Sequence, residues 1–187
     1  MQLTKLTMYK GPKRKFKVRK TMRRPKKLSE FGHQLLEKQK LRKAYNLRER
    51  VLKNYFLAAS KKKINIDNNF VQFLEQRLDN VIYRLGWAQT RPQAAQMVNH
   101  GLITVNKRTL NISSYQVKKG DVIEVKETKR DRQLFTVLTA KLEKFQPASW
   151  LEFTAKDKMK AQVISAPELS HFSEPVNISA ILQFYSR

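Results

Sequence analysis

Apolar residues recur every three or four positions in the first half of the chain, a spacing that predicts amphipathic helices. Ser29 is in position to cap the first of them, and a second is expected over Leu47–Ala59. A third is expected to begin at a cap on Asp67 or Asn68 and to run unbroken to Leu85. This part of the chain is therefore predicted to be mostly helical.

The pattern changes after Thr90, where one short helix is followed by short alternating segments. Thr90 and Gln93 have the spacing of a capping box, which predicts a helix that Gly101 ends. Strands are predicted over residues 102–105, 108–110, 115–117 and 122–125. Asn106 and Lys107 form the turn between the first two strands. Because Lys107 stands where a type I′ turn favours glycine, a longer turn or some backbone strain is expected there.

The last third of the chain predicts a further helix, two strands and an apolar C-terminus. The helix is expected over Thr128–Lys144, and the strands over Trp150–Phe153 and Ala161–Ile164. A loop over 165–175 leads to the closing ISAILQFYSR, which is apolar enough to dock back onto the fold.

The expected fold class is α+β, with a small module of two helices and a sheet inserted into a mostly helical first domain. The expected divisions are a basic N-terminal extension (1–27), a helical domain (28–74), the module (75–126) and a C-terminal helix and strands that pack back on the fold (127–187). No internal repeat is present in the sequence.

The net charge of +24 on 187 residues changes this picture, because it calls for a polyanionic partner. Nucleic acid is the first candidate, and an anionic membrane surface is the second. No apolar run approaches the roughly 20 residues of a membrane span, and no signal-peptide segment is expected near the N-terminus. Residues 1–63 hold 22 Lys and Arg against 3 acids, a balance of +19, while the remainder holds 17 against 12, a balance of +5. Most of the charge therefore lies in the first third.

Residues 1–27 contain twelve Lys and Arg and no acid, with too few apolar groups to fold alone. Two functions fit such a segment, a tail that threads between RNA phosphates and an organelle transit peptide. Transit peptides are usually rich in serine, and no serine precedes Ser29, which favours the RNA-binding tail. Its predicted RNA contacts are Lys13, Arg14, Lys15, Lys17, Arg19, Lys20, Arg23 and Arg24.

Basic residues also occupy the side of the predicted helices that lies opposite their apolar residues. They could form a solvated face or a phosphate-binding face, and the excess of bases over acids favours phosphate contact. In the helical domain the predicted contacts are Lys38, Lys40, Arg42, Lys43, Arg48 and Arg50. In the module they are Arg77, Arg91, Gln96, Asn99, His100, Lys107 and Arg108.

Neither a catalytic site nor a cofactor or metal site is predicted. The chain has no cysteine, which excludes disulfides, thiolate zinc sites and iron–sulfur clusters, and it has no glycine-rich phosphate loop. His33 and Glu37 have the spacing of two metal ligands on one helix face, but no third ligand accompanies them, so a surface polar pair is favoured. Asp79 lies between Arg77 and Arg84 and is interpreted as part of a structural ion pair.

The stretch RLDNVIYRLGWAQTRPQAAQMVNHGLITVNKRTLNISSYQV, from Arg77 to Val117, closely resembles the bacterial-type small-subunit ribosomal protein S-four family. Upstream, LSEFGHQLLEKQKLRKAYNLRERV resembles the helical domain of that family, and Tyr9–Pro12 and the final FYSR resemble its two ends. The resemblance covers nearly the whole chain. That coverage separates the chain from RNA-modifying enzymes that carry only the small module.

The resemblance implies a non-enzymatic protein that binds a multi-helix junction in the 5′ domain of small-subunit rRNA early in ribosome assembly. It also implies contacts with ribosomal protein S-five and other small-subunit proteins, and a place at the mRNA entry channel that influences accuracy. One alternative is an RNA-modifying or RNA-quality-control factor with the same module, and another is a basic protein of membrane surfaces. On the favoured interpretation, neither a membrane nor a small-molecule substrate is a partner.

The chain departs from the family pattern in two places. The segment between Lys10 and Leu28 is shorter than usual and lacks the cysteines that some members use for zinc, so no zinc site is carried over. Lys107 also replaces the usual turn glycine. A shortened member rich in Lys and Asn suggests an organelle. The mitochondrial matrix is favoured, with a plastid or a bacterial cytoplasm as alternatives.

Overall fold

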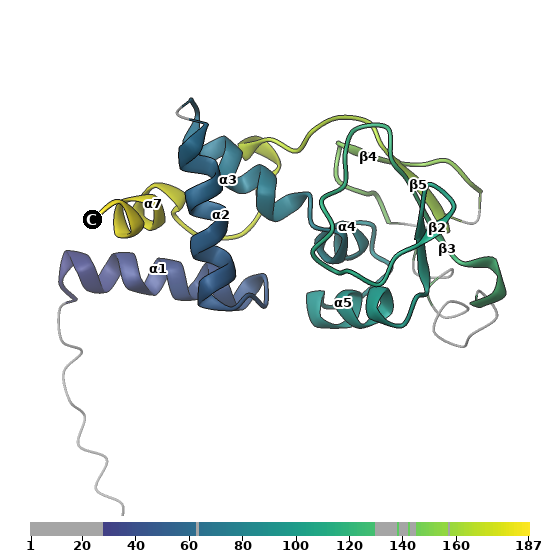
Figure 1. The fold of residues 1–187 in the computed structure, drawn as a ribbon, viewed down its shortest axis with the longest axis horizontal. Helices are drawn as coiled ribbons and strands as arrows, with labels where there is room; N and C mark the ends of the chain where they lie inside the picture. Colours follow the sequence, from purple (N-terminus) through teal and green to yellow (C-terminus); the bar gives the residue numbers. More distant parts are fainter. Residues whose placement is uncertain (1–27, 63, 130–137, 139–141, 143–144, 157) are drawn as a thin grey trace, which may run out of the picture.

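A computed structural model describes residues 28–62, 64–129, 138, 142, 145–156 and 158–187, which form the predicted α+β fold. Four helices form the helical domain at one end of the molecule (Figure 1): α1 (Glu30–Ala44), α2 (Glu49–Lys61), α3 (Ile66–Glu75) and α7 (Ile178–Ser186). The module at the other end contains α4 (Leu78–Arg84), α5 (Arg91–Asn99) and a sheet. The predicted RNA contacts between Lys13 and Arg24, and most of the helix predicted over 128–144, lie outside the described residues.

The first two predicted helices are confirmed as α1 and α2. The Ser29 hydroxyl caps α1 by accepting a hydrogen bond from the Gly32 N–H at 3.2 Å. The start of α3 differs from the prediction, since Asn65 rather than Asp67 or Asn68 occupies the N-cap position. Asn65 has a left-handed backbone (φ 49°) and makes no side-chain cap hydrogen bond. Asparagine tolerates this conformation better than most residues do, so the chain can turn sharply into α3.

The prediction of one unbroken helix up to Leu85 is wrong, because the chain breaks between α3 and α4. Arg77 at the break has an extended backbone (φ −63°, ψ 135°) and forms an isolated β-bridge with Gln116. The Leu78 N–H donates to the Tyr115 carbonyl at 2.8 Å. Pairing with this later segment takes backbone groups that a continuous helix would use, and local sequence carries no signal for it.

The sheet has five antiparallel strands in the order β2-β1-β3-β5-β4. Their bounds are β1 (Ile103–Val105), β2 (Arg108–Thr109), β3 (Val122–Val125), β4 (Leu151–Phe153) and β5 (Lys160–Val163). Each lies within a predicted strand or overlaps it, but the strand predicted over 115–117 is reduced to the single bridge at Gln116. Because β5 pairs with β3, the sheet continues past residue 126, where the module was expected to end. Two short 3₁₀ turns, η1 (Glu127–Lys129) and η2 (Leu169–His171), complete the described elements.

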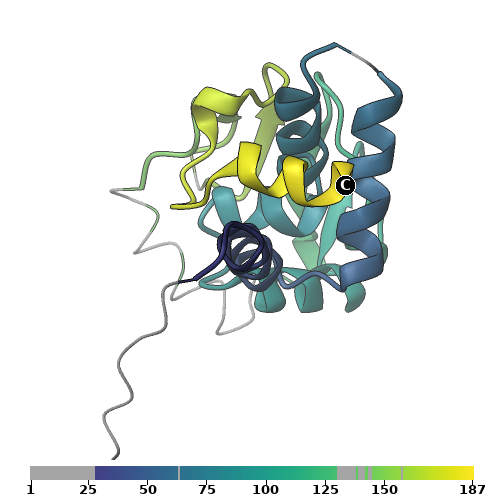
Figure 2. The same ribbon diagram turned by 90° about the vertical axis from the view of Figure 1, so that its left-hand side faces the viewer.

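Each end of the molecule has an apolar core of its own. In the module, α4, α5 and the sheet enclose the fully buried side chains of Trp87 and Trp150, with Leu138 and Leu142 in the same core. In the helical domain, α7 lies against α1, as Figure 2 shows, and buries Ile181 completely. The predicted docking of the apolar C-terminus is therefore confirmed. It brings the last residues of the chain back to the first described helix.

Candidate nucleic-acid interface

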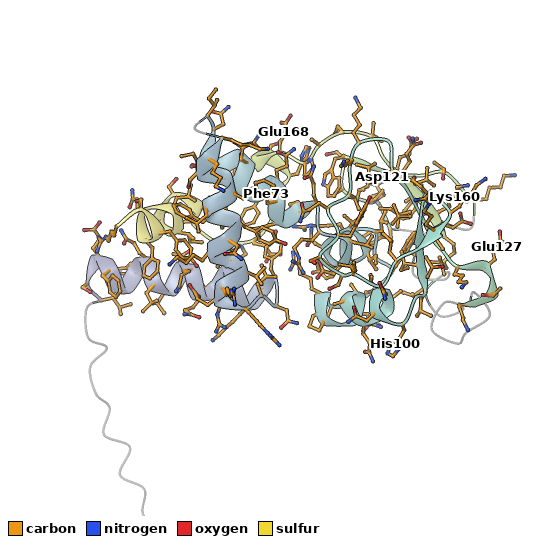
Figure 3. All side chains as sticks on the ribbon, in the orientation of Figure 1. Phe73, His100, Asp121, Glu127, Lys160 and Glu168 are labelled. Atoms are coloured by element: carbon orange, nitrogen blue, oxygen red, sulfur yellow. The ribbon has the colours of Figure 1, made fainter. Side chains whose placement is uncertain are left out.

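Exposed basic and polar side chains gather around the end of α1, the start of α2 and the outer side of α5, and we call this group the basic edge. Its members from the helical domain are Lys40, Lys43, Arg48 and Arg50, and those from the module are Gln96, Asn99 and His100. Figure 3 shows His100 pointing away from the molecule at the end of α5. All seven are predicted RNA contacts, and their exposure leaves them accessible to a phosphate backbone. Arg42 is half-buried and donates to Gln39 at 2.8 Å.

The two halves of the basic edge adjoin because α5 begins against the end of α1 (Figure 1). Arg91, the first residue of α5, donates from Nη1 to the carbonyl of Ala44, the last residue of α1, at 2.9 Å. Thr90 caps α5 as predicted, since its hydroxyl accepts from the Gln93 N–H at 3.3 Å. The Gln93 side chain accepts from the N–H of Gln89, so the reciprocal half of the capping box is shifted by one residue.

A second exposed group is built on the two-residue turn between β1 and β2. Asn106 and Lys107 have left-handed backbones (φ 50° and 66°), so the turn is tight and the strain expected at Lys107 is present. The Asn106 amide donates to Asp121 at 2.9 Å and accepts from the Val122 N–H at 2.9 Å. Asp121 in turn accepts from the Lys118 N–H at 2.8 Å. These hydrogen bonds hold the 106–107 turn against the 118–121 turn.

The exposed bases on these two turns form what we call the basic corner. Lys107 and Arg108 were predicted RNA contacts, and both are exposed. Lys118 and Lys119 lie on the adjoining turn, are exposed, and were missed as candidates. The only available signal was their place in a KKGD turn, which says nothing about the neighbouring hairpin. The corner thus presents four bases on a hydrogen-bonded support.

Three predicted contacts are corrected by the structure, because Lys38, Arg77 and Arg91 are only 6%, 6% and 7% exposed. The Lys38 ammonium donates to Glu49 at 2.8 Å and lies 4.4 Å from the centre of the Phe184 ring, so it joins α1, α2 and α7. Buried cations with partners of this kind cannot reach an outside phosphate. The periodicity of charges could not separate Lys38 and Arg91 from exposed cations, since their partners Glu49 and Glu174 lie on other segments of the chain.

The predicted ion pair of Asp79 is confirmed with Arg77, whereas Arg84 pairs with a different carboxylate. Arg77 donates from Nε and Nη2 to the two Asp79 oxygens at 3.0 and 2.6 Å, and from Nη1 to the Tyr55 hydroxyl on α2 at 2.7 Å. Arg84 donates to both oxygens of Glu75, at 2.9 and 2.7 Å. Each pair has bidentate geometry, which suits a buried arginine–carboxylate contact.

Glu75 is fully buried between the two cores and remains ionised because of its donors. Besides Arg84, it accepts from the Asn80 amide at 2.8 Å and from the Tyr45 hydroxyl. Burial alone would raise the pKa of Glu75, but the hydrogen bonds and charge of Arg84 lower it below its usual value. Burial and the neighbouring carboxylate raise the pKa of Tyr45 well above its usual value, so that its hydroxyl stays a donor.

On the helical domain, Glu30, Glu37 and Glu49 each form an ion pair with a lysine or arginine. Lys40 donates to Glu37 at 2.6 Å and lowers the pKa of that carboxyl, helped by the Asn177 N–H. His33 is exposed and does not join Glu37 in a ligand set. The described residues contain no group of three or more metal-ligating side chains, and none of their helices has the length and apolarity that crossing a bilayer requires.

Comparison with known proteins gives these surfaces a family context. The family model described as "S4 domain" matches residues 76–123, and the one described as "Ribosomal protein S4/S9 N-terminal domain" matches residues 2–75. Small ribosomal subunit protein uS4 of Aquifex aeolicus is 47% identical over 170 residues, which cover 88% of this chain and 79% of that relative. The chain belongs to the uS4 family. The same protein of Chromobacterium violaceum is 42% identical over 161 residues, covering 86% of this chain and 78% of the relative.

The two matched regions of this uS4 family member meet at the buried Glu75, where the structure changes from the helical domain to the module. The basic edge draws residues from both regions, whereas the basic corner lies wholly in the "S4 domain". Strands β4 and β5 lie beyond the matched region but belong to its sheet. The resemblance found in the sequence is therefore correct in family and in its coverage of the chain.

Proposed function

We propose that this protein is a structural, non-enzymatic component of the small ribosomal subunit that binds small-subunit rRNA. The observation that carries the proposal is the basic edge, where exposed lysines and arginines of the helical domain adjoin exposed Gln96, Asn99 and His100 of the module in a chain of the uS4 family. Relatives from several bacteria bear the name small ribosomal subunit protein uS4. A net charge of +24 supports a partner with many phosphates.

The chemistry of the exposed groups favours recognition of RNA shape over base sequence. A-form RNA has a deep, narrow major groove, so proteins recognise its duplexes mainly through phosphates, 2′-hydroxyls and overall shape. Lysine and arginine on the basic edge and basic corner supply phosphate contacts. Gln96 and Asn99 supply donors and acceptors that suit 2′-hydroxyls. Two separate basic groups on one rigid support would suit an RNA with several helices meeting.

We also propose the finer roles that the family resemblance implied. These are binding at a multi-helix junction in the 5′ domain, early action in assembly, contact with ribosomal protein S-five, and a place near the mRNA entry channel that influences accuracy. The extent of the exposed basic surface supports a junction over a single duplex. Footprinting of reconstituted particles tests the junction, and protection spread evenly over single duplexes would refute it.

Titration of the full chain against a 5′-domain rRNA fragment at several salt concentrations tests the central proposal. Affinity should fall steeply with salt, with a log–log slope of about 0.7–0.9 for each phosphate neutralised. A charge-reversing Arg108→Glu variant should reduce this slope by about one unit, and Arg108→Lys, which keeps the charge, serves as its control. Binding that salt leaves unchanged, or full-chain protein that never co-sediments with small subunits, would contradict the proposal.

The mitochondrial matrix remains a prediction for the compartment, based on the shortened chain and its richness in Lys and Asn. The bacterial relatives add no support for it. Cell fractionation followed by detection of the full chain decides between the matrix, a plastid and a bacterial cytoplasm.

A further inference from the structure

The two apolar cores of this protein are separate, and a layer of buried and half-buried polar side chains lies between them. Apolar packing tolerates sliding, whereas hydrogen-bonded polar groups have directions that only one arrangement satisfies. The layer therefore has the properties needed to fix an angle between domains. We call it the domain junction, and its members are Tyr45, Tyr55, Glu75, Arg77, Asp79, Asn80, Arg84, Arg91 and Glu174.

Arg91 connects more segments than any other member of the domain junction. Its Nε donates to Asn80 on α4 at 2.8 Å, and its Nη2 donates to Glu174, in the segment leading to α7, at 2.7 Å. With the Nη1 bond to the end of α1, three nitrogens bind three different segments. The guanidinium also lies between two rings, 4.1 Å from the centre of Tyr45 and 4.5 Å from that of Tyr83. One side chain thus joins both domains.

We propose that Arg91 and Glu174 are positioning residues for RNA binding: they hold the helical domain and the module at the angle that makes the basic edge one continuous surface. This inference rests on the proposed function. Arg91 itself is buried and touches no RNA in this arrangement. Its effect on RNA passes through the exposed bases on either side, Lys43 and Arg48 in one domain and His100 in the other.

A fixed angle between the domains would pre-organise the basic edge for RNA binding. If the angle between domains varied, each RNA-binding event would also have to select the matching angle, and affinity would fall by the fraction of molecules that have it. The junction has a second link, from Arg77 through its Nη1 to Tyr55 on α2. Loss of the Arg91–Glu174 pair should therefore loosen the angle while leaving both cores folded.

Glu174→Gln separates this proposal from a simple charge effect. The change removes one negative charge and so should strengthen binding to RNA if only net charge matters. If Glu174 positions the domains, the variant should instead bind the rRNA fragment about 10-fold more weakly, an ordinary size for coupling between sites. Glu152→Gln is the matched control, because Glu152 is exposed on β4 and its loss changes the charge equally.

Arg91→Lys is the second variant, since it keeps the positive charge but cannot bind three segments in one plane. It should weaken RNA binding by a similar factor with an unchanged salt slope, because no phosphate contact is lost. A tighter or unchanged affinity in Glu174→Gln, or a lower salt slope in Arg91→Lys, would overturn the positioning role. A thermal unfolding scan of each variant verifies that both domains remain folded.

A distance measurement tests the junction without RNA. The chain has no cysteine, so spin labels can be placed on Asn54→Cys of α2 and Gln162→Cys of β5, both exposed positions in different domains. The inter-label distance distribution should be narrow in the parent and the Glu152→Gln control and clearly broader in Glu174→Gln. An equally narrow distribution in Glu174→Gln overturns the inference. Failure of the parent to bind rRNA overturns the proposed function instead. The distance distributions then still show whether Glu174 fixes the angle between the domains.

Discussion

At the domain junction, Arg77, Arg84 and Arg91 each form an ion pair with a carboxylate and lie mostly out of contact with solvent. On the basic edge and basic corner, by contrast, Arg48, Arg50 and Arg108 are exposed, and within the described part of the chain none of them forms an ion pair. The same residue type therefore serves two purposes. A buried carboxylate partner, whether near in sequence as for Arg77 and Arg84 or distant as for Arg91, makes an arginine structural, and its absence leaves the charge available to a polyanion.

This comparison teaches that three of the 15 acids of the chain neutralise the three arginines of the junction. Glu75, Asp79 and Glu174 all lie at the junction, although acids are outnumbered by bases more than two to one in the whole chain. Burying a cation without a partner would cost several kcal/mol, so each buried arginine needs one of these carboxylates. The outer bases need none, because water and the expected RNA solvate them.

The largest effect is expected from breaking the junction at its centre with Glu75→Gln. The change leaves Arg84 buried without a counter-charge, which should lower the free energy of unfolding by about 3–5 kcal/mol. Urea unfolding followed by circular dichroism measures it. Glu152→Gln, at an exposed position, should change the stability by less than about 0.5 kcal/mol. Equal losses in the two variants would mean that the buried carboxylate has no special role.

Reversing the charge of Arg48 and Arg50 together tests the role of the exposed arginines. Both side chains are exposed, so stability should remain within about 0.5 kcal/mol of the parent. Affinity for the rRNA fragment should fall roughly 100-fold, with a salt slope lower by about two units. Replacing the same two residues by lysine keeps the charges and should preserve most of the affinity. If the reversed variant binds as the parent does, these arginines do not face RNA.

Lys107 affects both binding and stability, since it combines an exposed charge with a strained backbone (φ 66°). Lys107→Gly should raise the free energy of unfolding by about 0.5–1 kcal/mol, because glycine adopts this conformation without steric strain. The same change should weaken rRNA binding several-fold through the lost charge. Lys107→Ala removes the charge but keeps the strain, so it should lose affinity without gaining stability. A stabilised variant with undiminished affinity would show that the lysine is not kept for RNA.

The sequence predicted the elements better than it predicted how they meet. The spacing of apolar residues located α1, α2 and α5, and Ser29 and Thr90 marked two helix starts, because caps and periodicity are local properties. The break at Arg77 was missed, since it depends on pairing with Gln116 almost forty residues later. The pairing of β5 with β3 also joins distant parts of the chain, so β4 and β5 were predicted to lie outside the module although they belong to its sheet.

The exposure of candidate site residues was also predicted better where it depends on neighbouring residues in the sequence. His100, Lys107 and Arg108 lie in or beside turns, where exposure can be inferred from neighbouring residues, and all three are exposed. Arg91 was predicted to face outward from the pattern of α5, yet its partners Ala44 and Glu174 come from far along the chain in both directions. The sequence indicated the pairing of Arg77 with its neighbour Asp79, but not that of Arg91 with Glu174, which lies 83 residues away. The family resemblance predicted that the surface binds RNA, but it did not predict which side chains pair with one another inside the protein.

The smallest effect on stability is expected at Glu37, which forms an ion pair as the junction carboxylates do but lies near the surface. Its carboxylate accepts from Lys40 and from the Asn177 N–H at the start of α7, and these bonds lower its pKa from the usual 4.5. A lowered pKa in the folded state means that the unfolded chain binds the proton more readily. The stabilisation is therefore present above about pH 4.5 and is lost as the pH falls through the lower folded value.

The Glu37→Gln substitution should remove this part of the acid sensitivity. The difference in the free energy of unfolding between parent and variant should stay below about 1 kcal/mol at pH 7 and shrink toward pH 3, as expected for a pair with one exposed partner. Urea unfolding at a series of pH values measures it, with Glu152→Gln again as the exposed control. A difference that grows as the pH falls would have the wrong sign and would exclude a stabilising role for the Glu37 carboxylate.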